Sequence, residues 1–364
     1  MAQACPARPG QAGLSEAVMN AQIKSQPDTL ERIRDIYLWS RNDIESALDD
    51  AFAYDGDPVL IEIGAGPHRA WLRELLEHIR REYPNTIDFD LAYDGRLFRA
   101  HRDRSIRGDL IALRQVPAVA PGLEDLNLPR WWREFFMAKD LQRGGLILIC
   151  AVTGQGKSTT VGGIVKSRLT RYGGFCRTIE DPVELPLQGR HGDGMCIQTR
   201  VQWKGDERDI GFAGSLRSAL RSYPALSGGG TMCVVGEVRD AETAGELVRA
   251  AVNGHLVITT VHAGDVPTGV ARLLSMAEDG MGPNTARDLV ASGLRVAAHQ
   301  TLTLLPTGEG WQRGRLSGDL LVNTPTVAAV LRGNDVASKL REPLRHQLAQ
   351  HSRGRNFEEV LSRC

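Results

Sequence analysis

The stretch LILICAVTGQGKSTT, residues 146–160, runs from an apolar segment directly into a glycine-rich turn. The apolar part predicts a buried strand, and residues 158–169 predict a helix after the turn. Glycines let successive backbone N–H groups surround phosphate oxygens, while Lys157 can reach the β- and γ-phosphates and the Ser158 hydroxyl can hold Mg²⁺. The N-terminal dipole of the helix faces the same anion. The stretch therefore predicts a nucleotide phosphate loop in an α/β fold.

The residues expected to contact the nucleotide from this loop form one continuous run. They are Thr153, Gly154, Gln155, Gly156, Lys157, Ser158 and Thr159. The usual motif, G-x-x-x-x-G-K-[ST], begins with glycine, whereas this chain has Ala151 at that position. Alanine fits the loop if its φ angle is negative.

The composition restricts the class of protein. The 364 residues suggest two domains, and 44 basic side chains balance 44 acidic ones. This balance argues against a dedicated nucleic-acid coat or a polybasic membrane anchor. The six cysteines form no C-x₂-C pair, which argues against a zinc site and a disulfide framework. Because the longest apolar run, residues 146–152, is too short to cross a bilayer, a cytoplasmic location is expected.

Changes in sequence pattern divide the chain into four predicted parts. They are a flexible leader (1–25), an N-terminal α+β domain (26–118), a linker (119–128) and an α/β domain (129–364). The leader is rich in Ala, Gly, Gln and Pro, and prolines with a glycine mark the linker. The long alternation of strands and helices after the linker predicts a mainly parallel sheet, with helices at the C-terminal end from about residue 325.

Within the N-terminal domain, a helix is expected from Thr29. Apolar residues at helical spacing predict a second helix over 71–82. Strands are expected over 59–63, 86–93 and 96–113.

An acidic segment follows one further predicted strand. The segment TIEDPVE, residues 178–184, carries Glu180, Asp181 and Glu184 at the strand end, where an open α/β sheet gathers its ligands. Such a cluster suits Mg²⁺ and water. A solvated acidic turn is the alternative.

A second carboxylate follows the strand in TMCVVGEVRD, residues 231–240. In phosphate-loop enzymes such a strand delivers an acid beside Mg²⁺ and the attacking water, which favours Glu237 for that role. Gly236 stands where the commonest pattern has Asp, so metal coordination is expected to depend on Ser158, waters and the acids near Asp181. A strand that ends in an ordinary surface glutamate is the alternative.

A third strand, GHLVITTVH over 254–262, carries a histidine at each end. A histidine at the C-terminal edge of a strand, beside the γ-phosphate, can report whether nucleotide is present. Histidines at strand ends are more often structural, so both roles stay open for His255 and His262.

The order and spacing of these motifs resemble the secretion and pilus motor ATPases, the superfamily that contains PilT, GspE and DotB. AVTGQGKSTT matches that family's phosphate loop, TIEDPVE its acidic box, VVGEVRDAET its second nucleotide strand and GHLVITTVH its histidine box. FRAHRDRSIRGDLIALRQVP looks like the end of the family's N-terminal domain, and residues 321–332 look like the C-terminal segment of the PilT branch. The four-cysteine zinc module of the GspE branch is absent from the sequence, which favours the PilT and DotB side.

The resemblance implies a RecA-like phosphate-loop ATPase core, preceded by a small PAS-like α+β domain and followed by C-terminal helices. It implies that Lys157 and Ser158 bind phosphate and Mg²⁺, with Asp181 as a further metal ligand. Glu237 would activate or orient water, and Glu184 falls at the acidic-box glutamate close to that water.

Further implied roles concern His262 and three arginines. His262 falls at the histidine-box position near the γ-phosphate, although Ala263 follows it where the family often has Thr or Ser. Arg99, Arg107 and Arg114 match arginines that the family's N-terminal domain brings over the nucleotide phosphates. A solvated face and a nucleic-acid patch are the alternatives for this arginine-rich segment.

The function implied by the resemblance is Mg²⁺-dependent ATP hydrolysis by a ring-forming motor, expected to be a homo-hexamer. Such a motor powers type IV pilus assembly or retraction, or type II/IV secretion including conjugative transfer. An inner-membrane platform protein would be its partner and would hold it peripherally at the membrane, with no direct nucleic-acid contact. A DNA translocase or recombinase on a RecA-like core and a non-hydrolysing, nucleotide-dependent assembly scaffold are the alternatives.

Overall fold

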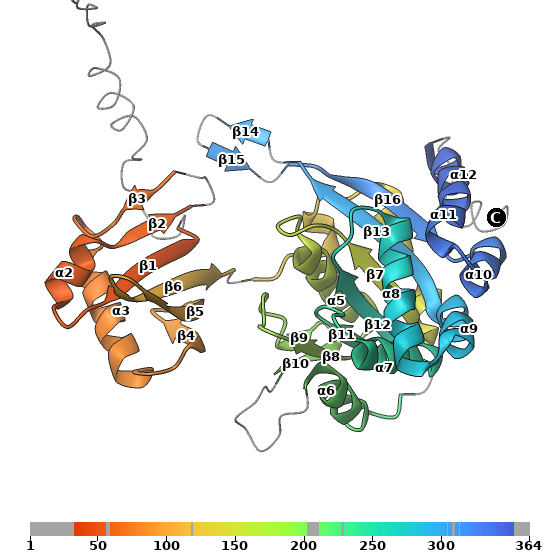
Figure 1. Cartoon of the computed structure of the whole chain (residues 1–364), viewed down its shortest axis with the longest axis horizontal. Coiled ribbons are helices and arrows are strands. Elements are labelled where there is room, and N and C mark those ends of the chain that lie inside the picture. The colour runs from red at the N-terminus through yellow and green to blue at the C-terminus, as the bar shows by residue number, and fades with distance from the viewer. Residues whose placement is uncertain are drawn as a thin grey trace, which may run out of the picture. The chain divides into compact units, whose positions relative to one another are not determined.

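The computed structural model describes residues 33–55, 59–117, 119–201, 211–226, 229–303, 305–307, 310–312 and 314–352 (Figure 1). The chain divides into two compact units. The first comprises Met1–Ala118 with Gly308–Trp311, and the second comprises Val119–Thr307 with Gln312–Cys364.

The first unit is a six-stranded antiparallel sheet in the order β3-β2-β1-β6-β5-β4 with helices α2 and α3. Its elements are β1 (Asp35–Ser40), α2 (Ile44–Asp49), β2 (Phe52–Tyr54), β3 (Ile61–Glu62), α3 (Arg69–Glu82), β4 (Asp88–Tyr93), β5 (Arg96–Ser105) and β6 (Gly108–Val116). The buried face of α3, with Leu72 and Leu76, shares one core with Ile36, Leu38 and Phe98 of the sheet. This α+β arrangement agrees with the pattern read from the sequence.

Most of the elements expected in this unit are present. The helix predicted over 71–82 is confirmed by α3, and β4, β5 and β6 confirm the strands predicted over 86–93 and 96–113. The helix predicted from Thr29 is wrong where the structure describes it, because 35–40 form β1; residues 29–32 lie outside the described ranges. Ile36 and Leu38 are buried at alternate positions, a spacing of two that suits a strand and not a helix.

The second unit contains an eight-stranded sheet in the order β16-β13-β7-β12-β11-β8-β10-β9. Its strands are β7 (Gly145–Cys150), β8 (Gly174–Glu180), β9 (Gly189–His191), β10 (Gly194–Arg200), β11 (Thr231–Val235), β12 (Leu256–Val261), β13 (Leu294–Leu302) and β16 (Leu316–Val322). Strands β13 to β10 in this order are parallel, and only the edge strands β16 and β9 run antiparallel. The predicted mainly parallel sheet is confirmed. A separate two-stranded sheet joins β14 (Leu305–Thr307) and β15 (Gly310–Gln312).

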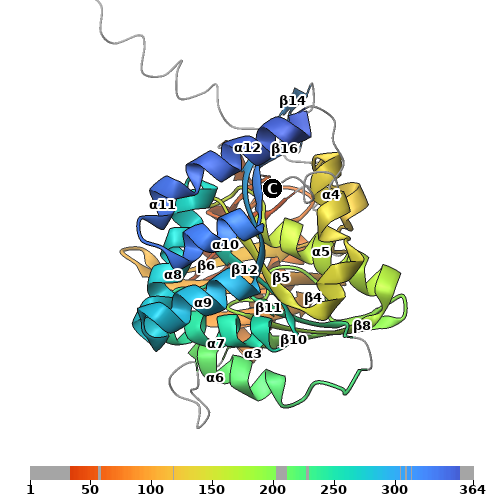
Figure 2. The same ribbon diagram turned by 90° about the vertical axis from the view of Figure 1, so that its right-hand side faces the viewer.

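Helices cover both faces of this sheet (Figure 2). One core lies against α4 (Arg130–Phe136) and α5 (Lys157–Tyr172), together with the short helices η2 (Leu123–Asp125) and η3 (Lys139–Arg143). The opposite core lies against α6 (Gly211–Leu220), α7 (Ala241–Val252), α8 (Val266–Met281), α9 (Pro283–Gly293), α10 (Pro325–Arg332), α11 (Val336–Lys339) and α12 (Arg341–Ser352). Strand β7 serves both, because Leu146 and Leu148 enter one core while Ile147 and Ile149 enter the other.

The segment before α4 is packed on the second unit. Leu123, Leu126 and Leu128 are buried in the core that contains α5, and Lys166 of α5 donates to the carbonyl of Ala120 at 2.6 Å. None of the described helices combines the length and the apolar character that a membrane span requires.

Candidate nucleotide-binding site

The predicted site residues of the second unit lie at one edge of the sheet. Strands β7, β8, β11 and β12 are parallel, so their carboxyl ends meet there. The phosphate loop follows β7, the acidic segment follows β8, Glu237 follows β11 and His262 follows β12. The sheet thus brings together four motifs that are spread over more than a hundred residues of sequence.

The loop conformation explains its glycines. Gly154 and Gly156 have φ angles of 80° and 78°, in the left-handed region that other residues rarely adopt. A Cβ atom at Gly154 would meet nothing within 4 Å, so its backbone angle and not crowding requires glycine. In the described chain, the residues other than glycine with positive φ are Asp94 and Asp335. Ala151 therefore meets the condition under which alanine fits the first position of the motif.

Helix α5 begins directly after the loop. Gly156 occupies its N-cap position and provides no side-chain cap, so the first N–H groups of the helix point into the loop region. Ser158 and Thr159 stand in this first turn. The helix dipole and these N–H groups favour an anion at this place.

Lys157 reaches back across the loop. Its Nζ donates to the carbonyls of Ala151 at 3.0 Å and Val152 at 3.1 Å, and lies 3.4 Å from Nδ1 of His262. Burial lowers the pKa of the Lys157 ammonium, and the carboxylates of Glu237 and Glu184 oppose that shift. The two carboxylates thus support a positive charge at the loop.

Glu237 is mostly buried, with 17% of its side chain exposed, and is held from two sides. Its Oε1 lies 3.3 Å from Nε2 of His262. Its Oε2 accepts from Nε of Arg239 at 2.9 Å and lies 2.8 Å from Nη2 of the same arginine. Glu237 is therefore fixed in orientation at the carboxyl edge.

His262 connects Lys157 to Glu237. Because the lysine ammonium can only donate, Nδ1 of His262 must accept, and the ring proton then lies on Nε2 facing the Glu237 carboxylate. The carbonyl of His262 accepts from Nη1 of Arg272 in α8 at 2.9 Å. Lys157, His262, Glu237 and Arg239 form one continuous polar chain.

Sequence reasoning missed Arg239 and Arg272. The sequence could have indicated Arg239, because this residue stands two positions after Glu237 in the same motif. It could not have indicated Arg272, because the contact of Arg272 depends on where α8 packs beside the end of β12.

The acidic segment divides into a supporting residue, Glu180, and two candidates for the site, the half-buried Asp181 and the exposed Glu184. Glu180 is half-buried, and desolvation raises the pKa of its carboxyl against the opposing hydrogen bonds from Thr178, Gln198 and the Glu184 amide. Its Oε1 accepts from Nε2 of Gln198 at 2.9 Å, and its Oε2 from the Glu184 N–H at 3.4 Å. Glu180 thus fixes the turn that carries Asp181 and Glu184 at this edge of the sheet.

Gly236, the departure beside Glu237, is not required by space. A Cβ atom there would meet the Ile179 carbonyl at 3.6 Å and Glu180 Cα at 3.7 Å, which are ordinary contacts. The Cβ atom of the usual Asp would therefore fit at position 236.

His255 lies at the opposite edge of the sheet. It precedes β12, and its Nδ1 is 2.9 Å from Oγ1 of Thr231 at the start of β11. Its ring centroid lies 4.9 Å from that of Tyr223, and burial lowers its pKa. Of the two histidines of this strand, His262 lies with the phosphate loop and His255 lies with structural neighbours.

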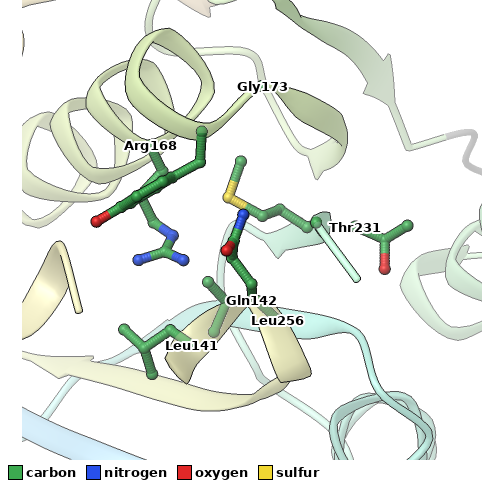
Figure 3. A pocket seen from close by; sticks show the side chains of 9 residues that line it. Leu141, Gln142, Arg168, Gly173, Thr231 and Leu256 are labelled. Carbon is green, nitrogen blue, oxygen red and sulfur yellow. The ribbon is translucent and has the colours of Figure 1, made fainter. Parts of the chain in front are cut away.

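A shallow hollow lies at the same amino edge (Figure 3). Leu141, Gln142, Thr231 and Leu256 help to line it, and the Arg168 side chain reaches into it from α5. Nη1 of Arg168 donates to the carbonyls of Phe136 at 2.8 Å and Ala138 at 3.0 Å. Arg168 thus stabilises the end of α4 and has a structural role. The hollow that it enters is separate from the phosphate loop.

The three predicted arginines belong to the first unit, whereas the phosphate loop belongs to the second. Arg99 and Arg114 stand opposite each other on β5 and β6. Nε of Arg114 donates to Oδ1 of Asp35 on β1 at 2.7 Å. Arg107 lies in the turn between β5 and β6, where its N–H donates to Oγ of Ser105. Two of the three thus share one sheet face, and the third is at the hairpin turn.

Several known proteins resemble this chain in sequence. The twitching motility protein of Neisseria gonorrhoeae is 28% identical over 264 residues, covering 71% of this chain and 65% of that protein. The uncharacterized protein YggR of Escherichia coli (strain K12) is 32% identical over 272 residues, covering 72% of this chain and 74% of that protein.

Solved structures share the fold. The pilus retraction motor PilT with bound ADP has a TM-score of 0.66 at 24% identity, covering 91% of this chain and 92% of that one. The ATPase DotB of Legionella pneumophila has a TM-score of 0.64 at 23% identity, covering 91% and 90%. These likenesses confirm the predicted fold class, while the PAS-like character of the N-terminal domain and the domain limits stay predictions. A sequence model of the type II/IV secretion system proteins matches residues 100–308. The chain therefore belongs to the family of type II/IV secretion system proteins.

Proposed function

We propose that the chain is a Mg²⁺-dependent ATPase that acts as the motor of a pilus or secretion machine. The observation that carries the proposal is the chain of contacts from Lys157 through His262 to Glu237, placed where three parallel strands end. Such a site has a cation for the phosphates and an oriented carboxylate for water, which are the parts that phosphoryl transfer needs. The fold shared with PilT and DotB supports the same reading.

The residues divide the work as follows. Lys157 and the N–H groups of the loop bind the β- and γ-phosphates, and Glu237 orients the attacking water. His262 holds Glu237 and lies beside Lys157, so it couples the water-orienting acid to the phosphate-binding cation. Glu184, whose charge acts on Lys157, is the second candidate for contact with that water.

Magnesium fits this donor set. Mg²⁺ usually takes one or two protein oxygens together with waters and substrate phosphates. Ser158 in the first turn of α5 and Asp181 after β8 would supply those oxygens. In the ranges covered by the structure, no three or more His, Cys, Asp or Glu side chains gather as a metal cluster. When bound, Mg²⁺ neutralises phosphate charge.

The work output would be a movement of the N-terminal domain against the ATPase domain. Arg99, Arg107 and Arg114 would meet the phosphates when the domains close, and would stabilise the charge of the transferring phosphoryl group. We propose a homo-oligomeric ring, a hexamer, at the cytoplasmic side of an inner-membrane platform protein. The names of the relatives, which include a type IV pilus ATPase PilU and a pilus retraction ATPase PilT from Pseudomonas aeruginosa, support an ATPase of a pilus machine.

The test compares Glu237→Gln with a matched control, Glu242→Gln. Glu242 also carries an arginine contact, to Arg217 at 2.8 Å, but lies in the first turn of α7. With Mg²⁺ and ATP, Glu237→Gln should bind ATP normally and release phosphate at least about 100-fold more slowly, the range for loss of a catalytic acid or base. The control should keep its turnover.

Three other outcomes contradict parts of this proposal. Wild-type turnover in Glu237→Gln would transfer the water-orienting role to Glu184. Absence of hydrolysis by the wild-type chain would favour the assembly scaffold. Strong stimulation of hydrolysis by double-stranded DNA would favour the DNA translocase.

A further inference from the structure

Two glutamine side chains join strand β13 to the phosphate loop. Nε2 of Gln300 donates to the main-chain carbonyl of Gln155 at 2.5 Å. Oε1 of Gln155 accepts from the N–H of Leu302 at 2.7 Å. We call this pair of hydrogen bonds the glutamine clasp.

The clasp forms where β7 stops. Cys150, the last residue of β7, pairs with His299 of β13. Beyond this pair β13 continues for three residues, while the other chain turns into the phosphate loop. Strand β7 ends before it could pair with Leu302, so the Gln155 side chain supplies the acceptor for the Leu302 N–H. A long amide side chain at Gln155 thus extends the sheet contact to the tip of the loop.

The orientation of the Gln300 amide is fixed by its partner. A carbonyl oxygen needs a donor, so Nε2 and not Oε1 must face Gln155. Gln300 is fully buried, and among the residues that the structure describes its Oε1 has no hydrogen-bond partner. An unpaired buried oxygen destabilises a fold, whereas leucine at this position would avoid that penalty. Stability alone therefore does not account for a glutamine here.

The clasp controls a peptide plane of the loop. In a trans peptide, the C=O of one residue and the N–H of the next point in opposite directions. Because Gln300 holds the Gln155 carbonyl toward β13, the Gly156 N–H points away from β13. Gly156 has a left-handed φ and no Cβ, so its peptide would otherwise turn easily.

We propose that Gln300 is a positioning residue for the nucleotide. Through the glutamine clasp, β13 fixes the peptide between Gln155 and Gly156 so that its N–H is available to a phosphate oxygen. Gln300 acts through the loop and does not itself contact the nucleotide. This role rests on the nucleotide-binding function proposed above.

The test uses the full-length chain and two matched variants, Gln300→Leu and Gln347→Leu. Gln347 is a buried glutamine too, and it bonds the N–H of Val322 at 2.8 Å and the carbonyl of Val322 at 2.9 Å, on β16. MgADP affinity is measured by calorimetry, and the stability of the nucleotide-free protein by denaturant unfolding. Amide hydrogen exchange at residues 153–157 reports the loop directly.

Gln300→Leu should weaken MgADP binding by about three- to tenfold, the effect of one lost hydrogen bond, with stability unchanged or raised. Gln347→Leu should lower stability and leave MgADP affinity within about twofold of wild type. Gln300→Glu, which sets an oxygen against the Gln155 carbonyl, should weaken binding at least as much as leucine does.

Unchanged MgADP affinity in Gln300→Leu would overturn the proposal. So would an affinity loss that comes with a stability loss as large as that of Gln347→Leu, because the role would then be structural. If wild type binds no MgADP, the proposed function fails, and the exchange measurement decides on the clasp alone. Faster exchange at residues 153–157 in nucleotide-free Gln300→Leu would still support the clasp, and equal exchange would overturn it.

Discussion

At the carboxyl edge of the eight-stranded sheet a half-buried lysine lies among carboxylates, whereas at the amino edge a buried arginine lies among main-chain carbonyls. Lys157 has Glu237 and Glu184 close enough to oppose the effect of burial on its pKa. Burial lowers the pKa of Arg168 to about 10, and the residues that line its hollow include no carboxylate. Each edge thus holds a cation that is at least half-buried, but of the two it is Lys157 that has acids beside it that can take part in chemistry.

This difference distinguishes side chains that can act on a ligand from side chains that stabilise the fold within one sheet. Side chains that bond mainly to the backbone, as Arg168 and Tyr223 do, hold helices and loops in place. His262 and Glu237 instead bond each other through side-chain atoms beside the phosphate loop, where they can act on a ligand. Each prediction below tests one side of this comparison.

The largest effect is expected from Lys157→Ala. The variant removes the cation that offsets phosphate charge, so ATP hydrolysis should fall by about 100-fold or more and nucleotide affinity should fall with it. Steady-state phosphate release and ATP titration measure both quantities. Lys166→Ala, on the same helix but bonded to the Ala120 carbonyl, should keep full hydrolysis. Full turnover in a folded Lys157→Ala protein would show that the phosphate loop is not part of the active site.

A smaller loss of turnover is expected when the first unit loses its candidate arginines. Arg107→Ala and Arg114→Ala should each bind nucleotide and turn over about tenfold or more slowly, because a charge-stabilising arginine is lost. Lysine should not restore the rate, since it lacks the planar fork of the guanidinium. Arg104→Ala, an exposed neighbour in the same hairpin, is the control.

Basal hydrolysis and DNA affinity of both variants are measured together. Unchanged basal hydrolysis in both would refute the closure of the N-terminal domain over the nucleotide. Loss of DNA binding with intact hydrolysis would instead support a DNA translocase.

At the amino edge the expected effect is on stability. Arg168→Met removes two hydrogen bonds from a buried guanidinium and leaves the carbonyls of Phe136 and Ala138 without this donor. The free energy of unfolding should fall by about 2–4 kcal/mol, with ATP turnover of the folded protein unchanged. Denaturant unfolding and phosphate release at low temperature separate the two quantities. A variant of normal stability but impaired turnover would contradict the division between the edges.

The smallest effect concerns pH. Burial lowers the pKa of His255 in the folded protein below the ordinary histidine value of 6.5. On acidification through 6.5 the unfolded chain therefore takes up a proton first, so stability is full above this pH and declines below it. His255→Asn should remove this contribution to the decline, so the variant should lose less stability on acidification than the wild type. Unfolding at pH 5 and at pH 7.5 measures it, and equal pH dependence in both proteins would show that His255 does not titrate on unfolding.

Local motifs made the carboxyl edge predictable. The glycines, Lys157 and Ser158 stand in one loop whose geometry follows from backbone angles, and Glu237 follows a strand with an obvious apolar pattern. The order of parallel strands then brings these motifs together without further information.

Other features depend on packing that a single sequence does not display. Gln300 meets Gln155 across 145 positions of sequence, and no local pattern marks a buried glutamine as a partner of the loop. Strand β1 is hard to distinguish from a helix in the sequence, because its buried apolar alternation consists of only two residues, Ile36 and Leu38. His255 and His262 look alike in sequence, and only the direction of β12 separates them.

The position of β7 in the sheet has a consequence for synthesis of the chain. Its two neighbours, β12 and β13, begin at Leu256 and Leu294, more than a hundred residues after β7 ends at Cys150. At about 5–20 residues per second, a ribosome needs roughly 7–30 s to pass from the end of β7 to the start of β13. Both edges of the apolar strand LILIC stay unpaired until β12 is made, and one edge stays unpaired until β13 is made, which makes the nascent chain a client for chaperones. The phosphate loop gains its hydrogen bonds to Gln300 and Leu302 only when β13 is made, so the glutamine clasp forms only once the second unit has folded as far as β13.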